Sequence, residues 1–410
     1  MNPLEQRRDV TRAYPLTVAY DGQAFLSANG GTGKGLQLKN LLGPYADHFL
    51  GFATKGRNYS DRLLIQGGFA GHQLWQQLSL PWFLQKWHAD YFLAPYNIAP
   101  LFVPQRTKLI LVLHDLILLE RFATPSLKQK LNNEFRRFLI PRAVGRAHIV
   151  LTVSDYTKQQ IQQRFPYARI EVIPCTIAHS WFIAERSSGI GQKENYVLSV
   201  VGNAAHKNSR GALEGFAKFV SMVDRSTAPR LRLVGLSDAA EEYQRHAKTL
   251  AIEELVDIEP YLTESQLQEL YRRARALLIP SLMEGFGIPV LEAMASGTPV
   301  LASNTTSLPE VGGNAAAYFN PTDTSEMAET LAQVLGEPAR QQRMIEQGFL
   351  QARQFHPEIV GARVRKFWDD LAEGARFPSP EPDLAANASV LEVSKRDGHR
   401  VLARPGSTQR

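Results

Sequence analysis

Two series of short apolar runs, each alternating with segments of helical pattern, constrain most what this chain can fold into. The runs are four to six residues long and rich in β-branched and aromatic residues, and the segments between them carry apolar residues at helical spacing. The first half holds the runs 16–20, 49–53, 91–94, 109–113, 149–153 and 170–173, and the second half holds 196–201, 231–235, 256–259, 276–279, 299–302 and 316–319. Strands that alternate with helices predict parallel sheets covered by helices on both faces. The sequence therefore predicts an α/β protein with two such sheets.

The segment 184–194 separates the two series and has the composition of a linker, because it is polar and contains glycine. A chain of 410 residues is long enough to bury two cores. We therefore expect a first domain over 1–183 and a second over 195–355. A helix with two large aromatic residues is predicted over 356–375. The last residues, 376–410, mix proline, serine and scattered charge without periodicity, which predicts a disordered tail.

The distribution of apolar and charged residues indicates where in the cell the protein is expected. No run of about 18 apolar residues occurs, and the first 12 residues are charged with no apolar segment behind them. We therefore expect a cytoplasmic protein with neither a membrane span nor a secretory signal. The single cysteine, Cys175, excludes an internal disulfide and a cysteine-based metal cluster, and it is expected to be a small buried side chain.

The segment 126–146 has the pattern of a basic amphipathic helix. Six Lys and Arg stand against one acid, Glu134, and apolar residues recur at helical spacing at Leu127, Leu131, Phe135, Phe138 and Leu139. Two interpretations fit. The apolar side faces the core and the basic side faces water, or the helix rests on an anionic membrane and brings the protein to a lipid-linked partner. Nucleic acid is not expected as a partner, because no recognised binding motif accompanies the charge.

Two carboxylates flank a turn between a predicted strand and a predicted helix. Glu284 and Glu292 lie eight positions apart in the stretch 281–297, which follows the run 276–279. Two glycines permit a tight turn and a proline suits the first turn of a helix, so Glu284 is predicted in the loop and Glu292 on the helix. The free N–H groups at the helix start suit a phosphate, and carboxylates suit sugar hydroxyls. The spacing alone also fits a solvated loop residue and a helix-surface charge.

Three further loops follow predicted strands. The loop 29–35 is rich in glycine but departs from both the P-loop and the dinucleotide-binding fingerprint. The pair His114 and Asp115 ends the run 109–113, and Lys207 precedes a predicted helix start. Residues at the carboxyl ends of parallel strands gather at the ligand cleft, so these loops are candidates for function. Taken singly, each also fits a structural role.

The string Glu284-Gly-Phe-Gly, with 291–300 (Leu-Glu-Ala-Met-Ala-Ser-Gly-Thr-Pro-Val) and 307–313 (Ser-Leu-Pro-Glu-Val-Gly-Gly), closely resembles the nucleotide-sugar-dependent retaining glycosyltransferases of family 4. This resemblance implies two facing Rossmann-like domains, the GT-B type of fold. It also implies that the predicted helix 356–375 crosses back onto the first domain.

The resemblance assigns roles to individual residues. His114, Asp115 and Glu284 are expected to act at the transferred sugar, His114 through a sugar hydroxyl and Asp115 by orienting nearby groups. The expected donor-binding residues are Gly31, Gly33, Asn203, Lys207, Phe286, Gly287, Ile288 and Glu292. Among them the glycines of 29–35 and Lys207 are expected beside the diphosphate, the backbone of the turn beside the sugar hydroxyls, and Glu292 beside the ribose.

Two positions in this comparison stay open. Asn203 stands near the place where the family has an arginine, and either Asn203 or His206 is the replacement. Ser154 and Lys158 also match a family segment, although helix capping explains Ser154 equally well.

The expected reaction follows from these residues. No Asp-x-Asp pair and no His or carboxylate cluster with metal-ligand spacing occurs, so neither a metal nor another cofactor is expected, and Lys207 with the helix N-terminus would stabilise the departing diphosphate. We expect a retaining transferase that moves a hexosyl unit from a nucleoside diphosphate sugar to a saccharide or lipid-linked acceptor in bacterial surface polysaccharide synthesis. The motifs look most like mannosyltransferases that use GDP-mannose. A glucosyl or N-acetylhexosaminyl donor, an epimerase or phosphorylase on the same fold, and a non-catalytic sugar-nucleotide binding protein remain open.

Overall fold

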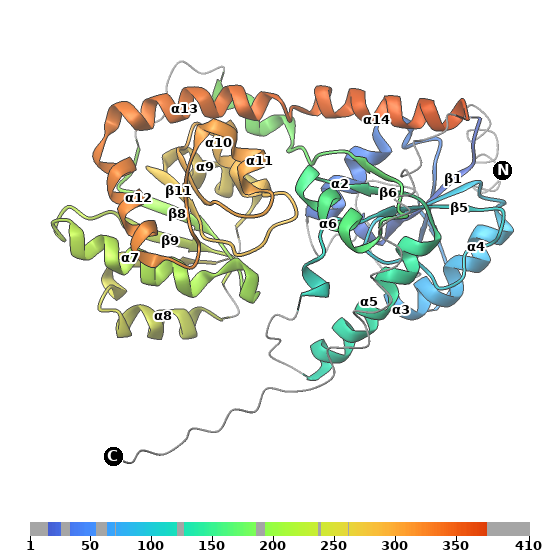
Figure 1. Cartoon of the computed structure of the whole chain (residues 1–410), viewed down its shortest axis with the longest axis horizontal. Coiled ribbons are helices and arrows are strands. Elements are labelled where there is room, and N and C mark those ends of the chain that lie inside the picture. The colour runs from blue at the N-terminus through green and yellow to red at the C-terminus, as the bar shows by residue number, and fades with distance from the viewer. Residues whose placement is uncertain are drawn as a thin grey trace, which may run out of the picture.

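A computed structural model describes residues 15–25, 33–54, 64–69, 71–120, 127–185, 193–236, 239–260 and 262–374. Within these residues the chain forms two parallel sheets with helices on both faces, which confirms the predicted fold class (Figure 1). We call the sheet of the N-terminal half with its helices the first domain, and the sheet of the C-terminal half with its helices the second domain.

The first sheet has the order β3-β2-β1-β4-β5-β6-β7 among the described residues, and all its pairs are parallel. Its strands are β1 (Val18–Asp21), β2 (Leu50–Ala53), β3 (Ile65–Gln66), β4 (Tyr91–Ala94), β5 (Lys108–Val112), β6 (Ala147–Thr152) and β7 (Ile170–Val172). Each of the predicted runs 16–20 to 170–173 became a strand, with ends shifted by up to two residues. Only β3 was missed, because two residues carry too little periodicity to be recognised.

The helices of the first domain cover both faces of this sheet. They are η2 (Gly22–Phe25), α2 (Gly33–Leu42), η4 (Gly43–Tyr45), α3 (His72–Leu74), the π-helix η5 (Trp75–Ser79), α4 (Leu80–Lys86), η6 (Ile117–Leu119), α5 (Leu127–Arg146) and α6 (Asp155–Arg164). The next helix, η7 (His179–Glu185), packs its buried aromatic residues into a core cluster of the second domain. The sequence predicted a loop over 29–35, whereas α2 begins at Gly33 within that segment. That prediction was wrong because the glycines hid the first turn of the helix.

The second sheet has the order β10-β9-β8-β11-β12-β13 and is also parallel. Its strands are β8 (Tyr196–Val200), β9 (Arg230–Val234), β10 (Val256–Glu259), β11 (Ala276–Ile279), β12 (Val300–Ser303) and β13 (Ala316–Phe319). The helices are η8 (Ala205–Lys207), α7 (Ser209–Met222), α8 (Ala240–Thr249), η10 (Glu253–Leu255), α9 (Glu264–Arg273), α10 (Ile288–Ala295), α11 (Leu308–Gly312), η11 (Gly313–Ala315), α12 (Thr324–Gly336) and α13 (Pro338–Arg353). Cys175 lies buried in a core cluster of this domain, as expected for a small apolar side chain.

The C-terminal helix α14 (Pro357–Ala372) crosses from the second domain onto the first, as the fold resemblance implied (Figure 1). Trp368 is fully buried, donates its Nε1–H to the carbonyl of Leu41 at 2.7 Å, and packs against Phe49 with ring centroids 4.7 Å apart. Phe367 shares the same core cluster with strands of the first sheet. The crossing is therefore held by an apolar core rather than by surface contacts.

The domain limits at 183, 195 and 355 stay a prediction, because the expected linker includes 186–192, which lie outside the described residues. The predicted tail 376–410 also lies outside them. Among the described helices, none combines the length and the apolar character needed to cross a bilayer.

Helix α5 does not turn its predicted apolar side to the core. Leu139 is buried, but Leu131, Phe135 and Phe138 are 65%, 37% and 47% exposed. The core-facing interpretation of 126–146 is therefore wrong for the first part of this helix. Its last turns contact the core instead, through Ile140, Ala143 and Val144.

Candidate active site

The strand order of the second sheet reverses between β8 and β11. From β8 the chain moves outward through β9 and β10, and it returns to the other side of β8 at β11. Ligands of open parallel sheets bind outside the carboxyl ends of the strands at such a reversal. Lys207 follows β8 and Glu284 follows β11, so both predicted residues lie at this position. The fold thus explains why two residues 77 positions apart meet.

Lys207 and Glu284 form an ion pair. Lys207 Nζ donates to Glu284 Oε1 at 2.8 Å, and Ser281 Oγ donates to the same oxygen at 2.8 Å. The two charged side chains are 26% and 12% exposed, so water screens the pair only in part. The pair places a positively charged hydrogen-bond donor beside a carboxylate that can accept hydrogen bonds from hydroxyls, at the same point of the sheet edge.

The backbone on both sides of this pair is fixed by hydrogen bonds. Asn208 adopts a left-handed conformation (φ 54°) and donates from Nδ2 to the carbonyls of Pro280 and Pro321 at 3.0 and 2.9 Å. The N–H of Leu282 donates to the carbonyl of His206 at 2.7 Å. The loop that carries Lys207 is therefore joined directly to the turn that carries Glu284.

The turn itself needs its glycines. Gly287 has φ 107° and precedes α10, and Pro289 lies in the first turn of the helix, as predicted. Ser307 Oγ lies 3.0 Å from the carbonyl of Glu284 and 2.9 Å from that of Phe286, within hydrogen-bonding distance of both. These contacts hold the turn that leads into α10.

Gly285 brings the two domains into contact. A Cβ on Gly285 would lie 2.2 Å from the carbonyl oxygen of His114 and 3.1 Å from Cβ of Asp115. Ser154 Oγ and Thr157 Oγ1 of the first domain donate to the carbonyl of Gly285 at 2.7 and 3.2 Å. The structure therefore brings the predicted His114–Asp115 strand end against the predicted turn.

Glu310 forms a second contact between the domains, at the start of helix α6. Its carboxylate accepts hydrogen bonds from the backbone N–H groups of Asp155 and Tyr156, at 2.9 and 3.0 Å, at the start of α6. Ser154 caps the same helix by accepting from the N–H of Thr157 at 3.1 Å. The predicted capping role of Ser154 is confirmed, and Glu310 completes the cap from the other domain.

His114 and Asp115 are both held by neighbouring groups. The ring of His114 is buried, with Nε2 2.9 Å from the carbonyl of Pro95, and Asp115 Oδ1 accepts from the N–H of Ile117 at 3.0 Å. Asn97, which the sequence analysis did not single out, accepts from the N–H of His114 at 2.8 Å and donates to the carbonyl of Asp115 at 3.3 Å. The one feature that marks Asn97 as unusual is its left-handed backbone conformation (φ 63°), which cannot be read from the sequence.

Glu292 lies on the second turn of α10 and is bound to the fully buried Tyr271, whose hydroxyl donates to Oε2 at 2.8 Å. Burial raises the pKa of Glu292 from 4.5 to about 7, although the Tyr271 hydrogen bond opposes this shift. Glu292 is thus no helix-surface charge. The expected ribose contact stays a prediction.

Glu292→Gln is expected to flatten the pH dependence of stability. Between pH 4.5 and about 7 the unfolded chain releases this proton while the folded chain retains it, so stability falls as pH rises through that window. A glutamine has the same shape and does not titrate. The melting temperature measured from pH 4.5 to 7.5 should therefore decline less in the variant than in the wild-type protein. Glu241→Gln, at an exposed position of α8, should keep the wild-type decline, and equal slopes for Glu292→Gln and the wild-type protein would contradict a raised pKa of Glu292.

The other predicted donor-binding residues are placed as follows. Asn203 is exposed in the loop after β8, and His206 is half-buried beside Lys207. Burial lowers the pKa of His206, and the Lys207 charge lowers it further, so His206 is disfavoured as a source of positive charge. The Phe286 side chain is buried against Phe355, which leaves its backbone for a ligand, and Ile288 opens α10. Gly33 begins α2, and Gly31 lies outside the described residues.

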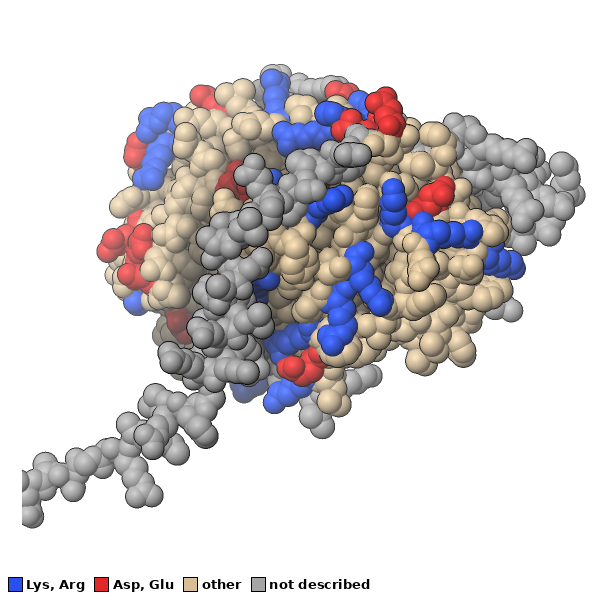
Figure 2. Space-filling model, turned by 45° about the vertical axis from the view of Figure 1, so that its right-hand side comes forward, with Lys and Arg blue, Asp and Glu red and all other residues tan. Residues whose placement is uncertain are grey.

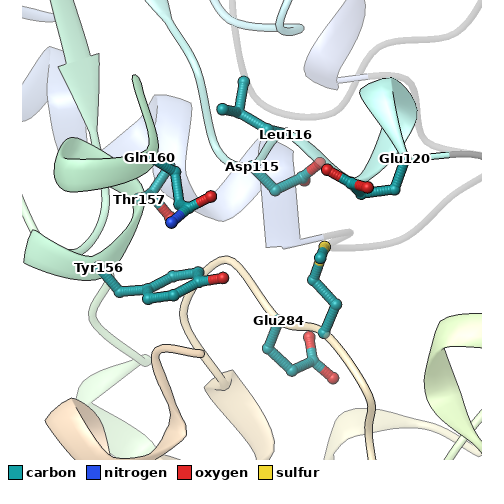
Figure 3. Close-up of a pocket in the computed structure, with 8 residues that line it drawn as sticks. Asp115, Leu116, Glu120, Tyr156, Thr157, Gln160 and Glu284 are labelled. Carbon is teal, nitrogen blue, oxygen red and sulfur yellow. The ribbon is translucent and has the colours of Figure 1, made fainter. Parts of the chain in front are cut away.

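A pocket opens where the two domains meet (Figure 3). The segment after β5 contributes Asp115, Leu116 and Glu120, α6 contributes Tyr156, Thr157 and Gln160, and the turn contributes Met283 and Glu284. In Figure 3 the carboxylates of Asp115 and Glu284 lie on opposite sides of this space. Glu120 is also paired with Arg164 at 2.5 Å. The cavity volume is about 10 Å³, which is too small for a sugar ring unless the two domains move apart. The acidic, amide and phenol groups around it are of the kinds that bind sugar hydroxyls.

The described residues hold no group of three or more His, Cys, Asp or Glu side chains that could bind a metal ion.

Two family models match this chain in succession. The model of glycosyltransferase family 4 matches residues 44–181, and the model of glycosyl transferases group 1 matches residues 183–351. The chain belongs to these glycosyltransferases. Each match lies on one of the two domains, and the group 1 match contains Lys207 and the whole turn with both glutamates.

Curated relatives of this glycosyltransferase include mannosyltransferases. O-antigen chain mannosyltransferase B of Escherichia coli is 28% identical over 63% of the chain and 70% of the relative. O-antigen chain mannosyltransferase RfbU of Salmonella typhimurium is 34% identical over 46% of the chain and 51% of the relative. The matches therefore span between about half and seven tenths of the length of these relatives.

Solved structures share the fold at low identity. Sucrose-phosphate synthase from Thermosynechococcus elongatus has a TM-score of 0.65 and 16% identity and covers 88% of this chain and 100% of its own. Anabaena HepE, solved in complex with UDP and glucose, has a TM-score of 0.63 and 16% identity over 86% and 99% of the two chains. These likenesses concern the GT-B architecture alone.

Proposed function

We propose that this glycosyltransferase transfers a mannosyl unit from GDP-mannose to a saccharide or lipid-linked acceptor in bacterial surface polysaccharide synthesis. One observation carries the proposal: the Lys207–Glu284 pair lies at the strand reversal of the second sheet and faces the His114–Asp115 strand end of the first. The O-antigen mannosyltransferases among the relatives support the sugar and the pathway class. The donor sugar and the class of acceptor are inferences of this proposal.

In the proposed reaction the bond between the anomeric carbon and the diphosphate oxygen breaks, and that oxygen takes the electron pair. The acceptor hydroxyl oxygen forms the new bond to the anomeric carbon, and its proton passes to the departing diphosphate. Lys207 and the N–H groups that begin α10 would stabilise the negative charge of the departing diphosphate. Glu284 would exchange its bond with Lys207 for hydroxyls of the transferred sugar, to which a carboxylate binds strongly. His114 and Asp115 would border the same sugar from the first domain.

Glu292 would bind the ribose of the donor. Tyr271 holds one carboxylate oxygen, and within the described residues no partner is recorded for the other, which is left for a ribose hydroxyl. The Gly33 end of α2 would lie near the diphosphate from the other domain, together with Gly31.

The same proposal holds that transfer retains the anomeric configuration, needs no metal or other cofactor, and takes place in the cytoplasm, with 126–146 in contact with the membrane. Protein charge would serve the diphosphate in place of a cation, since Lys207 already lies where the strand order of the second sheet reverses. An anionic membrane would supply lipid-linked acceptors.

GDP-mannose is expected to stabilise the protein more than UDP, ADP or TDP sugars in a thermal-shift screen run with EDTA. Ligand stabilisation grows with the ratio of concentration to Kd and reaches about 2.7 kcal/mol at a hundredfold excess over Kd. Transfer from GDP-mannose to a mannoside acceptor, run in parallel, should be unchanged by EDTA. Loss of transfer on chelation would overturn metal independence, a larger shift with another donor would overturn the choice of GDP-mannose, and donor isomerisation without acceptor would indicate an epimerase.

A further inference from the structure

Large apolar side chains are exposed on one side of the first domain. They come from the segment before α3, the continuous helix α3–η5–α4, the loop after β4, and α5. Their exposed fractions range from 37% to 65%, and we call this set the apolar crest: Phe69, Leu74, Leu78, Trp82, Leu101, Phe102, Leu131, Phe135 and Phe138. Nine such side chains exceed what scattered exposure of apolar residues on a soluble surface explains.

Hydrogen bonds join the four segments of the crest into one surface. The N–H of Phe69 donates to Ser79 Oγ at 3.0 Å, and the N–H of Leu101 donates to Gln77 Oε1 at 2.8 Å. Gln73 of α3 is bonded to Asn132 of α5. Leu74, Leu78 and Trp82 succeed one another at spacings of four residues, so they follow one line along the helix.

Most charged residues around the crest are basic. In residues 64–108 and 127–146 Lys and Arg outnumber Asp and Glu by nine to two. Asp90 accepts from the N–H of Thr17 and Glu134 pairs with Arg137, so both acids are engaged. Lys86 Nζ lies 4.7 Å from the Trp82 ring centroid and Arg142 Cζ lies 3.5 Å from that of Phe138. Figure 2, in which the first-domain side is turned forward, shows Lys and Arg spread over a largely uncharged face with fewer Asp and Glu.

We propose that the apolar crest and its basic rim dock on an anionic lipid bilayer. The aromatic and leucine side chains of the crest enter the interface between headgroups and acyl chains, while Lys and Arg beside them meet the lipid phosphates. A second copy of this chain is disfavoured as the occupant, because two basic rims would face each other. This surface extends well beyond 126–146 and has α3–η5–α4 as its second half.

The docked side also lies next to the candidate active site. Arg137 of α5 donates from Nε to the carbonyl of Leu118 at 2.6 Å and from Nη2 to the carbonyl of Glu120 at 2.9 Å. Glu120 lines the pocket between the domains. In Figure 1 helices α3, α4 and α5 lie on the side of the first domain opposite to α14. A membrane-bound orientation would thus place the first-domain wall of the pocket, which includes Glu120, near the bilayer.

The test is sedimentation of the full-length protein with vesicles of phosphatidylcholine alone or mixed with phosphatidylglycerol. We expect binding to the anionic vesicles only, and weaker binding at high salt. Leu78→Ser with Trp82→Ser should weaken binding about tenfold, and Lys86→Gln with Lys130→Gln should weaken it about fivefold for each residue. Vesicle binding requires no sugar donor, so its failure is distinct from a failure of the proposed reaction.

Leu350→Ser with Lys248→Gln is the matched control, because both residues are exposed on the second domain. Its vesicle binding should equal that of the wild-type protein. If the Leu78/Trp82 variant melts early, Leu131→Ser with Phe138→Ser replaces it. Equal losses in control and crest variants overturn the assignment of the surface. Self-association in sedimentation equilibrium that the crest variants abolish, without vesicle binding, identifies a second copy as the occupant and also overturns it.

Discussion

Glu284→Gln is expected to lower kcat/KM for sugar transfer by about a hundredfold to a thousandfold, the range found when one group that stabilises a transition state is removed. A neutral amide keeps the size of the side chain and the contact with Ser281, but it loses the charge that pairs with Lys207 at 2.8 Å and binds sugar hydroxyls more weakly. The measurements are initial rates with GDP-mannose and a mannoside acceptor, and the melting temperature of the same preparation.

The melting temperature should change little, since Lys207 retains 26% exposure and water can solvate its charge once the partner is neutral. Glu337→Gln is the control, because Glu337 forms an exposed ion pair with Arg343 at 2.8 Å on α13 and lies outside the candidate site. Its activity should equal that of the wild-type protein. A strongly destabilised but active Glu284→Gln would show that Glu284 acts in folding and not in transfer.

Gly285→Ala is expected to reduce transfer by at least about tenfold by separating the two domains. The new methyl group would lie 2.2 Å from the carbonyl oxygen of His114, a contact between two backbone segments that no rotamer relieves. Overpacking of this kind costs about 1–3 kcal/mol, and a small separation of the domains removes it. The separation would lengthen the bonds from Ser154 and Thr157 to the Gly285 carbonyl.

The effect should appear in kcat more than in nucleotide affinity. Lys207, Glu284 and Glu292 all belong to the second domain, so calorimetric binding of GDP should remain close to that of the wild-type protein. Gly336→Ala is the control, because an added Cβ there meets nothing within 4 Å at the end of α12. Wild-type kcat in Gly285→Ala would mean that this domain contact is not needed for transfer.

Much of the architecture could be read from local pattern. The runs 91–94, 256–259, 276–279 and 316–319 became strands with the predicted ends, because buried strands of parallel sheets are short, apolar and bounded by polar or glycine residues. The turn before α10 could also be predicted from the sequence, because a backbone at φ 107° favours glycine and the first turn of a helix accommodates proline.

Contacts between distant segments could not be predicted from the sequence. Glu310 caps α6 across 155 positions, Tyr271 binds Glu292 across 21, and Asn97 fixes the His114–Asp115 backbone across 17 or 18. Each depends on where the sheets place two loops, and no spacing in the sequence records it. The same holds for α5, whose apolar residues have a core-facing pattern although three of them are exposed.

The sequence by itself determined the two α/β sheets, the candidate loops and the family, because periodicity, glycine and proline act over a few residues. Only the tertiary structure decided that Lys207 pairs with Glu284, that Gly285 meets His114, that Glu292 is desolvated, and that an apolar crest stays outside. These features arise when strand order and helix packing bring separate segments together, and their energies depend on burial and distance, which are properties of the folded chain alone.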